Sequence, residues 1–289
     1  MTVDRLQTCR RDDEMEGAAA QSASRTGFQK DARDMPLAYH PMPLWLSLVF
    51  FGIPSLLAWL SIYIGIPTLS KAGVSLFWSF WLCLSTPMVI LFAAALTAYR
   101  LEGHPWTWAG IKARFRLKPM RRRDWLWTLV LVAWTGGYML LRQSLSRWLA
   151  SLPLFAPPEF LPSLLDPRLE MTSLTQEMMG IPLKGNGWIL LVQIGVLFFN
   201  IFGEEFWWRG YILPRQELAF GKNTWWIHGL LWAAFHTFWK WDFLSLLPGC
   251  LLLSFVVVKR KNTTPAVIWH WINNGLTLIA ILFGILGIG

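Results

Sequence analysis

Long apolar stretches that contain no Asp, Glu, Lys or Arg dominate the chain from residue 44 onward. They recur seven times, at about 44–66, 74–99, 125–141, 187–203, 224–239, 243–258 and 263–288. A helix that crosses a bilayer needs about 17–25 mainly apolar residues, because each residue adds about 1.5 Å. The pattern predicts an all-α fold, a polytopic membrane helix bundle of about seven transmembrane helices, or eight if a further helix lies near 142–165.

Two of these stretches are short and one is interrupted. The stretches at 224–239 and 243–258 have 16 residues each, so the local bilayer is thinned or their ends snorkel. The stretch at 187–203 becomes long enough if its helix continues through Glu204 and Glu205 toward Gln216. The segment 151–186, rich in Pro and polar residues, is predicted to be an extracytoplasmic loop with a short surface helix.

The composition agrees with a membrane protein. Hydrophobic residues make up 54% of the 289 positions and charged residues 15%, against about 25% in soluble proteins. This excludes a disordered chain, collagen and a disulfide scaffold. Cys9, Cys83 and Cys250 have no metal-binding spacing and are predicted to be free thiols.

The polar and apolar regions divide the chain into three parts. Residues 1–43 are polar and mixed in charge, and we expect a disordered cytoplasmic tail that is not a cleaved signal peptide. Residues 44–186 hold N-terminal transmembrane helices and loops. Residues 187–289 hold the third part, which carries all the chemical motifs described below.

Basic residues predict the orientation. The net charge is +9, and 13 Lys and Arg residues fall in loops that alternate onto one face, against six on the other. The positive-inside rule makes the richer face cytoplasmic, so we expect an integral, multi-pass protein of the cell (inner) membrane with a cytoplasmic N-terminus. The positive charge lies between apolar spans, so we expect no nucleic acid partner.

Ionisable residues interrupt the fourth apolar stretch, and such residues inside a membrane tend to mark function. Glu205 and Arg209 are four residues apart, so they share a helix face and can pair. Glu204 points about 100° away and has no cation on its own face. One carboxylate is therefore expected to be neutralised and the other to be free for chemistry. Asn200, one turn before Glu204, extends a polar stripe.

Histidine and asparagine side chains mark the later stretches. His228 and His236 share a face with Trp232 between them, and His228 is expected near the cytoplasmic interface. His270 and Asn274 share a face of the last helix. Rough depths put Glu204, His236 and His270 in the inner half of the membrane. A carboxylate can activate water, and imidazole and amide groups can orient water, bind metal or stabilise an oxyanion.

These residues resemble the CPBP or Abi family, which includes type II CAAX prenyl endopeptidases and bacteriocin-processing proteins. The family pattern is Glu-Glu-x-x-x-Arg, then Phe-x-x-x-His, then His-x-x-x-Asn on successive membrane helices. The chain has Glu204-Glu205-Phe-Trp-Trp-Arg209 and His270-Trp-Ile-Asn-Asn274. The second motif, Trp232-Ala-Ala-Phe-His236, has Trp where Phe is usual. The resemblance covers roughly 187–286.

The resemblance implies an intramembrane endopeptidase that hydrolyses membrane-associated or lipidated protein or peptide substrates. Glu204 would activate water with His236, His270 and Asn274 would hold the oxyanion, and Glu205 with Arg209 would support the site. Glu204, His236 and His270 could instead bind zinc, with one position open. The cofactor stays unknown, with a slight preference for no obligatory metal.

Two other classes of function remain open. A non-catalytic family member would act as an immunity factor or membrane scaffold, and an ion-coupled transporter would use Glu204 and His236 as a relay. Intact motifs disfavour the first and the lack of an internal repeat disfavours the second.

The water-filled opening of the site is expected to face the cytoplasm. Large aromatic residues would either accommodate a hydrophobic substrate or pack within the protein: Trp207, Trp208, Trp232, Phe235 and Trp271.

Overall fold

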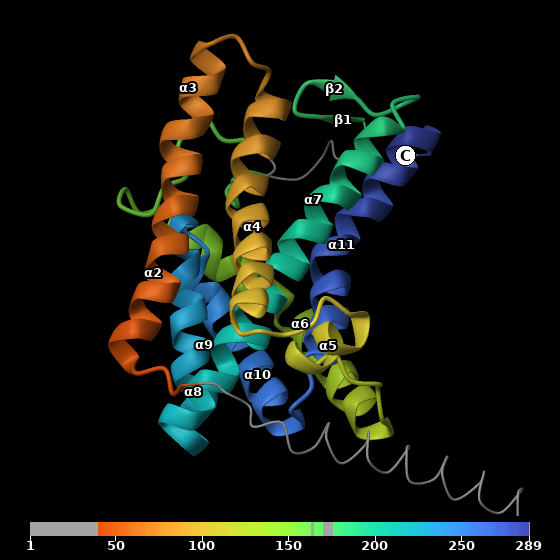
Figure 1. Ribbon diagram of the computed structural model, residues 1–289. Coiled ribbons are helices and arrows are strands. Elements are labelled where there is room, and N and C mark those ends of the chain that lie inside the picture. The colour runs from red at the N-terminus through yellow and green to blue at the C-terminus, as the bar shows by residue number, and fades with distance from the viewer. Residues whose placement is uncertain (1–39, 163–164, 170–175, 289) are drawn as a thin grey trace, which may run out of the picture. The chain divides into compact units, whose positions relative to one another are not determined.

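The computed structural model describes residues 40–162, 165–169 and 176–288 (Figure 1). Residues 1–39, which make up most of the predicted tail, lie outside the described residues, as does Cys9. Residues His40–Gly289 form one compact unit. The predicted all-α membrane bundle is confirmed, and β1 (Glu177–Met178) and β2 (Ile181–Pro182) form a small antiparallel hairpin in the loop before the motifs.

All seven predicted apolar stretches are helical. The α-helices are α2 (Leu44–Leu60), α3 (Ile66–Lys71), α4 (Leu76–Leu101), α5 (Trp108–Arg114), α6 (Arg122–Ala150), α7 (Trp188–Glu204), α8 (Leu213–Phe220), α9 (Thr224–Phe235), α10 (Phe243–Arg260) and α11 (Thr264–Leu286). Wider π-helical turns, η1 (Ser61–Gly65) and η3 (Glu205–Ile212), and 3-10 turns, η4 (Gly221–Asn223) and η5 (His236–Phe238), continue several of them. The described residues between α6 and α7 contain no α-helix, so no eighth membrane helix is seen among them beyond the end of α6 at Ala150. Residues 163–164 and 170–175 of the predicted extracytoplasmic loop lie outside the described residues.

Five segments are long and apolar enough to cross a membrane. They are Leu44–Lys71, Leu76–Leu101, Trp188–Phe238, Phe243–Arg260 and Thr264–Leu286. The third has 51 residues, which as one straight helix would extend about 77 Å, far beyond a hydrocarbon core of about 30 Å. It contains α7, α8 and α9, and the chain reverses direction around α8 (Figure 1). The stretch predicted at 125–141 lies in α6, which is not among the five.

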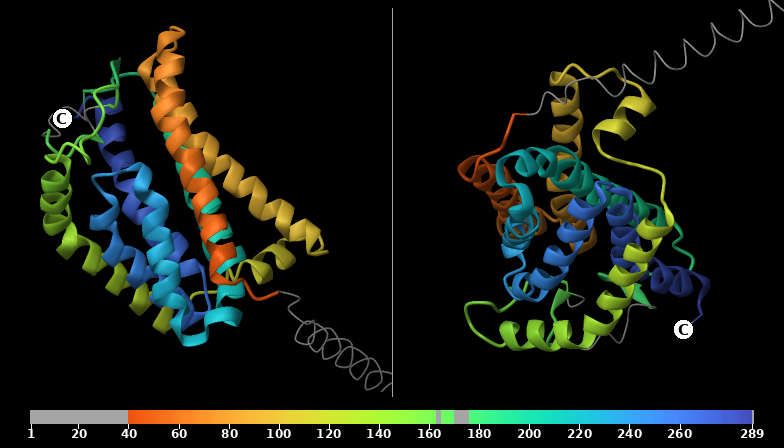
Figure 2. Two further views of the ribbon diagram at one scale, coloured as in Figure 1. Left: turned by 90° about the vertical axis from the view of Figure 1, so that its left-hand side faces the viewer. Right: turned by 90° about the horizontal axis from the view of Figure 1, so that it is seen from below.

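The α9–α10 hairpin is shorter than the predicted pair of spans. Helix α9 has only 12 residues and rises about 18 Å before the 3-10 turn that begins at His236. Figure 2 shows this hairpin ending well below the turn between α3 and α4. His236 is therefore at the end of a short helix and not in the middle of a long one.

Glycines let the helices around the motifs approach closely. A Cβ at Gly203 on α7 would lie 2.5 Å from the backbone oxygen of Met88 on α4. A Cβ at Gly229 on α9 would lie 2.9 Å from Cα of Leu251 on α10. Helix α7 also packs on α11, and α9 on α2, so the helices that carry the three motifs share one core.

The predicted basic loops gather at one end of the bundle, where α5, α8 and the end of α10 lie (Figure 1). Glu102 accepts hydrogen bonds from Arg114 at 2.8 Å and from Arg215 at 2.6 Å. Burial alone would raise the pKa of Glu102, but the two guanidinium groups outweigh it and the pKa is lowered. Asp124 pairs with Arg260 at 2.7 Å. These ion pairs join loops that are distant in the sequence.

Candidate functional site

The first motif lies where α7 changes into the π-helical segment η3. Glu204 is the last residue of α7 and Glu205 the first of η3. π-Helical turns are rare and often lie at functional sites, because the widened turn re-aims side chains. All residues from 204 to 210 are buried, so this ionisable segment is enclosed by protein.

Glu204 is held by two hydrogen bonds, one to each carboxylate oxygen. Asn200, one turn earlier on α7, donates from Nδ2 to Oε1 at 2.9 Å. Trp232 on α9 donates from Nε1 to Oε2 at 3.0 Å. The residue is only 3% exposed. Neither donor carries a charge, so Glu204 forms no ion pair among the described residues.

Glu205 is fully buried and has two cationic or potentially cationic partners. Its Oε1 lies 3.1 Å from an Arg209 guanidinium nitrogen and 3.0 Å from Nδ1 of His270 on α11. The predicted pairing of Glu205 with Arg209 is present. The guanidinium carbon of Arg209 also lies 3.5 Å from the ring centroid of Trp232. Glu205 therefore joins the first and third motifs.

His236 caps the C-terminal end of α9 and is half-buried. Its Nδ1 lies 2.8 Å from the backbone oxygen of Trp232. A carbonyl can only accept, so Nδ1 carries the proton and the neutral ring presents a lone pair at Nε2. No direct hydrogen bond between His236 and Glu204 occurs among the described residues. The two side chains are joined through Trp232.

Asn274 reaches Glu204 through Asn200. Asn274 donates from Nδ2 to Oδ1 of Asn200 at 2.8 Å, and Asn200 donates in turn to Glu204. Asn273 donates to Oδ1 of Asn274 at 2.9 Å. These two hydrogen bonds fix the orientation of the Asn274 amide group, with Nδ2 directed to Asn200 and Oδ1 to Asn273.

The structure thus connects all six residues that the family motifs singled out, through Trp232 and Asn200. The indole of Trp232 contacts Glu204 and Arg209, its backbone contacts His236, and its ring lies 6.4 Å from that of His270. Asn200 connects Asn274 to Glu204. Sequence reasoning missed the Trp232 donor, the bridging function of Asn200 and the contact between Glu205 and His270. The spacing of Asn200 from Glu204 was a usable signal, but the other two contacts join distant segments.

Some aromatic residues and His228 lie outside this network. His228 is fully buried, and its Nδ1 lies 2.7 Å from Oε1 of Gln216, so it packs within the protein one turn from the start of α9. Trp208 is also fully buried and stacks on Phe51 with ring centroids 4.3 Å apart. Trp207 is 8% exposed and stacks on Tyr211. These two tryptophans pack in the core.

The donors expected for a metal do not gather in one place. Among the described residues, no group of three or more His, Cys, Asp or Glu side chains is arranged to hold a metal ion. Glu204, His236 and His270 each have a different partner, and Nδ1 of His270 is directed to Glu205. In this arrangement the three residues do not fit a zinc site with one open position.

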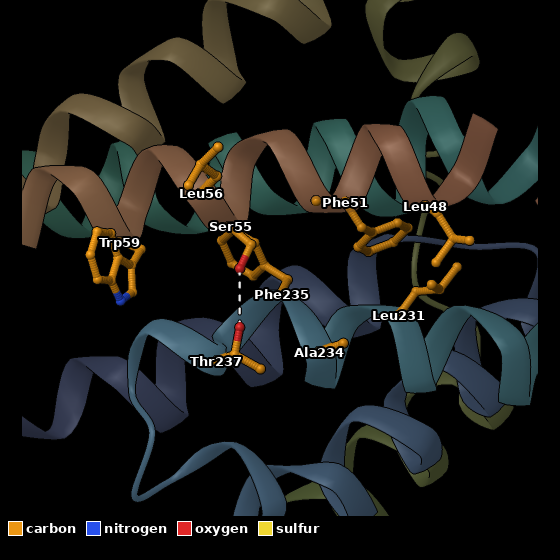
Figure 3. Close-up of a pocket in the computed structure, with 10 residues that line it drawn as sticks. Leu48, Phe51, Ser55, Leu56, Trp59, Leu231, Ala234, Phe235 and Thr237 are labelled. Atoms are coloured by element: carbon orange, nitrogen blue, oxygen red, sulfur yellow. Dashed lines mark hydrogen bonds between the residues drawn. The ribbon is translucent and has the colours of Figure 1, made fainter. Parts of the chain in front are cut away.

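An apolar pocket of about 430 Å³ lies between α2 and α9, beside the end of the site (Figure 3). Phe235 and Thr237, the chain neighbours of His236, both line it, and Ser55 and Thr237 hydrogen bond across it at 3.3 Å. The other lining residues are Leu48, Phe51, Gly52, Leu56, Trp59, Leu231 and Ala234. Several of these face outward from α2, as a groove open to lipid would require.

The fold and the site define a polytopic membrane protein with a buried carboxylate, imidazole and amide network. A model of the family described as Rce1-like, type II CAAX prenyl endopeptidase, matches residues 186–276. The match contains all three motifs, so the resemblance that they indicated is confirmed. It supports a CAAX-type intramembrane protease in general. Comparisons with curated proteins and with solved structures gave no match.

Proposed function

We propose that the protein is an intramembrane endopeptidase that hydrolyses a peptide bond of a membrane-associated protein or peptide. One observation carries the proposal: Glu204 is a buried carboxylate with two neutral donors and, among the described residues, no ion pair, in a core that matches a protease family. A buried carboxylate is costly unless it has a task, and this one is not committed to an ion pair. Glu205 forms the ion pair beside it.

Glu204 acts as the general base. It takes a proton from water while the water oxygen attacks the scissile carbonyl carbon, and it returns a proton to the amine nitrogen when the C–N bond breaks. The lone pair of His236 at Nε2 accepts a hydrogen bond from the same water and orients it. The partly buried position of His236 at the end of α9 still leaves a fraction of its surface open to incoming water.

His270 and Asn274 stabilise the oxyanion. Because Nδ1 of His270 faces the Glu205 carboxylate, its Nε2 can donate a hydrogen bond only when the ring is an imidazolium. Glu205 stabilises that cation, and Arg209 is positioned by the same carboxylate. Asn274 supplies its second amide proton, since the first is used by Asn200.

The substrate enters from the lipid. The pocket between α2 and α9 offers an apolar, open wall beside His236 for a hydrophobic or lipidated segment. The cytoplasmic end, with its concentration of basic residues, supplies water. No obligatory metal is required in this mechanism, since the base, the water-orienting imidazole and the oxyanion donors are all side chains of this chain.

The test is cleavage of membrane-associated peptides, prenylated and unmodified, by purified protein in lipid. We expect turnover by the wild-type protein, and at least a hundredfold loss in Glu204→Ala and in His236→Ala without loss of folding, because general base catalysis is worth about 10²–10⁴-fold. A cleaving Glu204→Ala protein would remove this residue from the mechanism.

Two further outcomes would favour other functions. Binding of the peptides without cleavage by the wild-type protein would favour a non-catalytic scaffold or immunity factor, and ion flux that depends on Glu204 would favour a transporter. Elemental analysis with a chelator control tests the metal. Stoichiometric zinc whose removal stops turnover, and whose return restores it, would contradict a metal-independent reaction.

A further inference from the structure

Trp232 is the residue at which the second motif departs from the Phe that is usual there. It is 3% exposed and lies at the centre of the site. Its indole Nε1 donates to Oε2 of Glu204 at 3.0 Å, an interaction that Phe cannot make. Its backbone oxygen accepts a hydrogen bond from Nδ1 of His236. One residue thus contacts the proposed base and also fixes the tautomer of the proposed partner imidazole.

We propose that Trp232 is a positioning residue for the general base, and that its indole N–H holds the Glu204 carboxylate in the orientation that takes the proton from water. This inference rests on the proposed function of Glu204. A donor to one carboxylate oxygen fixes the rotation of the group, and in a water-poor site such a hydrogen bond is stronger than at a surface. Asn200 satisfies Oε1, so Trp232 is the donor to Oε2.

A purely structural function of the ring is the competing explanation. The guanidinium of Arg209 stacks on the same indole, with its carbon 3.5 Å from the ring centroid, and this contact alone would retain a large aromatic residue at position 232. Stacking needs the ring face, whereas the effect on Glu204 needs the N–H group. A change at position 232 that removes the N–H but keeps the ring therefore distinguishes the two explanations.

The experiment measures kcat and KM, per folded molecule, for the full-length protein in lipid. It compares the wild type, Trp232→Phe, and a protein with 3-benzothienylalanine at position 232, in which sulfur replaces the N–H within a ring of the same size. Without the donor the carboxylate turns away from the orientation that takes the proton from water. We expect kcat to fall about tenfold to a hundredfold in both variants and KM to stay within about threefold of wild type, because a misplaced base affects the chemical step and not substrate binding.

The matched control is Trp188→Phe. Trp188 at the start of α7 donates its indole N–H to Oδ1 of Asn186 at 3.0 Å, so this change removes a similar hydrogen bond outside the site. We expect its kcat and KM to equal those of the wild type. Size-exclusion chromatography and thermal unfolding of each preparation measure how much protein is folded, so misfolding does not imitate the expected fall in kcat.

The outcomes distinguish this inference from the proposed function. Absence of cleavage by the wild type would overturn the proposed function. Cleavage by the wild type, with an unchanged kcat in the benzothienylalanine protein, would overturn the positioning function of Trp232 and leave Glu204 as the base. If Trp232→Phe does not fold, the benzothienylalanine protein alone decides, because it preserves the stacking on Arg209.

Discussion

At the scale of single residues, Glu204 and Glu205 are neighbours in the chain with opposite environments. Within the described part of the chain, Glu204 receives hydrogen bonds only from neutral donors, whereas Glu205 lies between Arg209 and His270. The change from α-helix to π-helix between them helps direct one side chain toward α9 and the other toward α11. The site uses one carboxylate for chemistry and the other to hold its surroundings.

Glu205→Ala should destabilise the protein strongly. The change leaves Arg209 as a fully buried, unpaired charge and removes the partner of His270 Nδ1. We expect a loss of about 3–5 kcal/mol in the free energy of unfolding, a lower melting temperature and loss of activity. Thermal unfolding in detergent measures this.

The comparison for this prediction is Asp166→Ala. Asp166 pairs at 2.6 Å with Arg168, whose side chain is 43% exposed, and such solvent-exposed pairs contribute roughly 0–1 kcal/mol. We expect a melting temperature close to that of the wild type. Equal small effects of both substitutions would mean that the charge of Arg209 is compensated without Glu205.

At the scale of elements, helix α7 determines where the first motif lies. Its Gly203 contacts the backbone of α4, and the next residue is Glu204. The approach of two helices is closest at small residues, because a side chain would separate the backbones. The contact between α4 and α7 thereby sets the depth and rotation of Glu204.

Gly203→Ala should therefore disturb both stability and activity. The added Cβ would lie 2.5 Å from the backbone oxygen of Met88, and neither backbone can yield without moving a helix. We expect a destabilisation of about 1–3 kcal/mol and reduced turnover, because Glu204 moves with α7. Unfolding and cleavage assays on the same preparation measure both effects.

Gly195→Ala on the same helix is the matched control. A Cβ there would meet no atom within 4 Å, so the substitution should be neutral or stabilise the helix by up to about 1 kcal/mol. If Gly203→Ala were as harmless as Gly195→Ala, the contact between α4 and α7 would not be what positions Glu204.

At the scale of the whole unit formed by residues 40–289, the two ends of the bundle differ in their content of basic loops. The predicted cytoplasmic loops lie together and are joined by ion pairs of Glu102 and Asp124. Lys222 lies at this end, between α8 and α9, and Lys184 lies at the other end, beside β2 (Figure 1). Both residues are exposed, so they can report on orientation.

Cysteine labelling at these two positions tests the orientation that the positive-inside rule predicts. In a Cys9→Ser background, we expect Lys222→Cys to react with an impermeant maleimide only from the cytoplasmic side, and Lys184→Cys only from the opposite side. Cys83 and Cys250 are buried and should stay unlabelled, which the parent protein checks. The reverse labelling pattern would refute the cytoplasmic opening together with the orientation.

The sequence by itself determined the class of fold and the identity of the motif residues. The length of an apolar stretch can be read directly from consecutive residues. Inside a bilayer the backbone must satisfy its own hydrogen bonds, so long apolar stretches form helices. The pairing of Glu205 with Arg209 was also readable, because residues four apart on one helix are always neighbours. The family match over 186–276 agrees with the motifs read in this way.

Only the tertiary structure decided which residues on different helices meet. The donation from Trp232 to Glu204 joins residues 28 positions apart, and the contact of Glu205 with His270 joins residues 65 apart. In the structure α9 also ends at Phe235, whereas the apolar stretch continues to residue 239. Such contacts depend on how helices cross and rotate, which close packing at positions such as Gly203 and Gly229 sets, and helical periodicity gives no information about the facing helix.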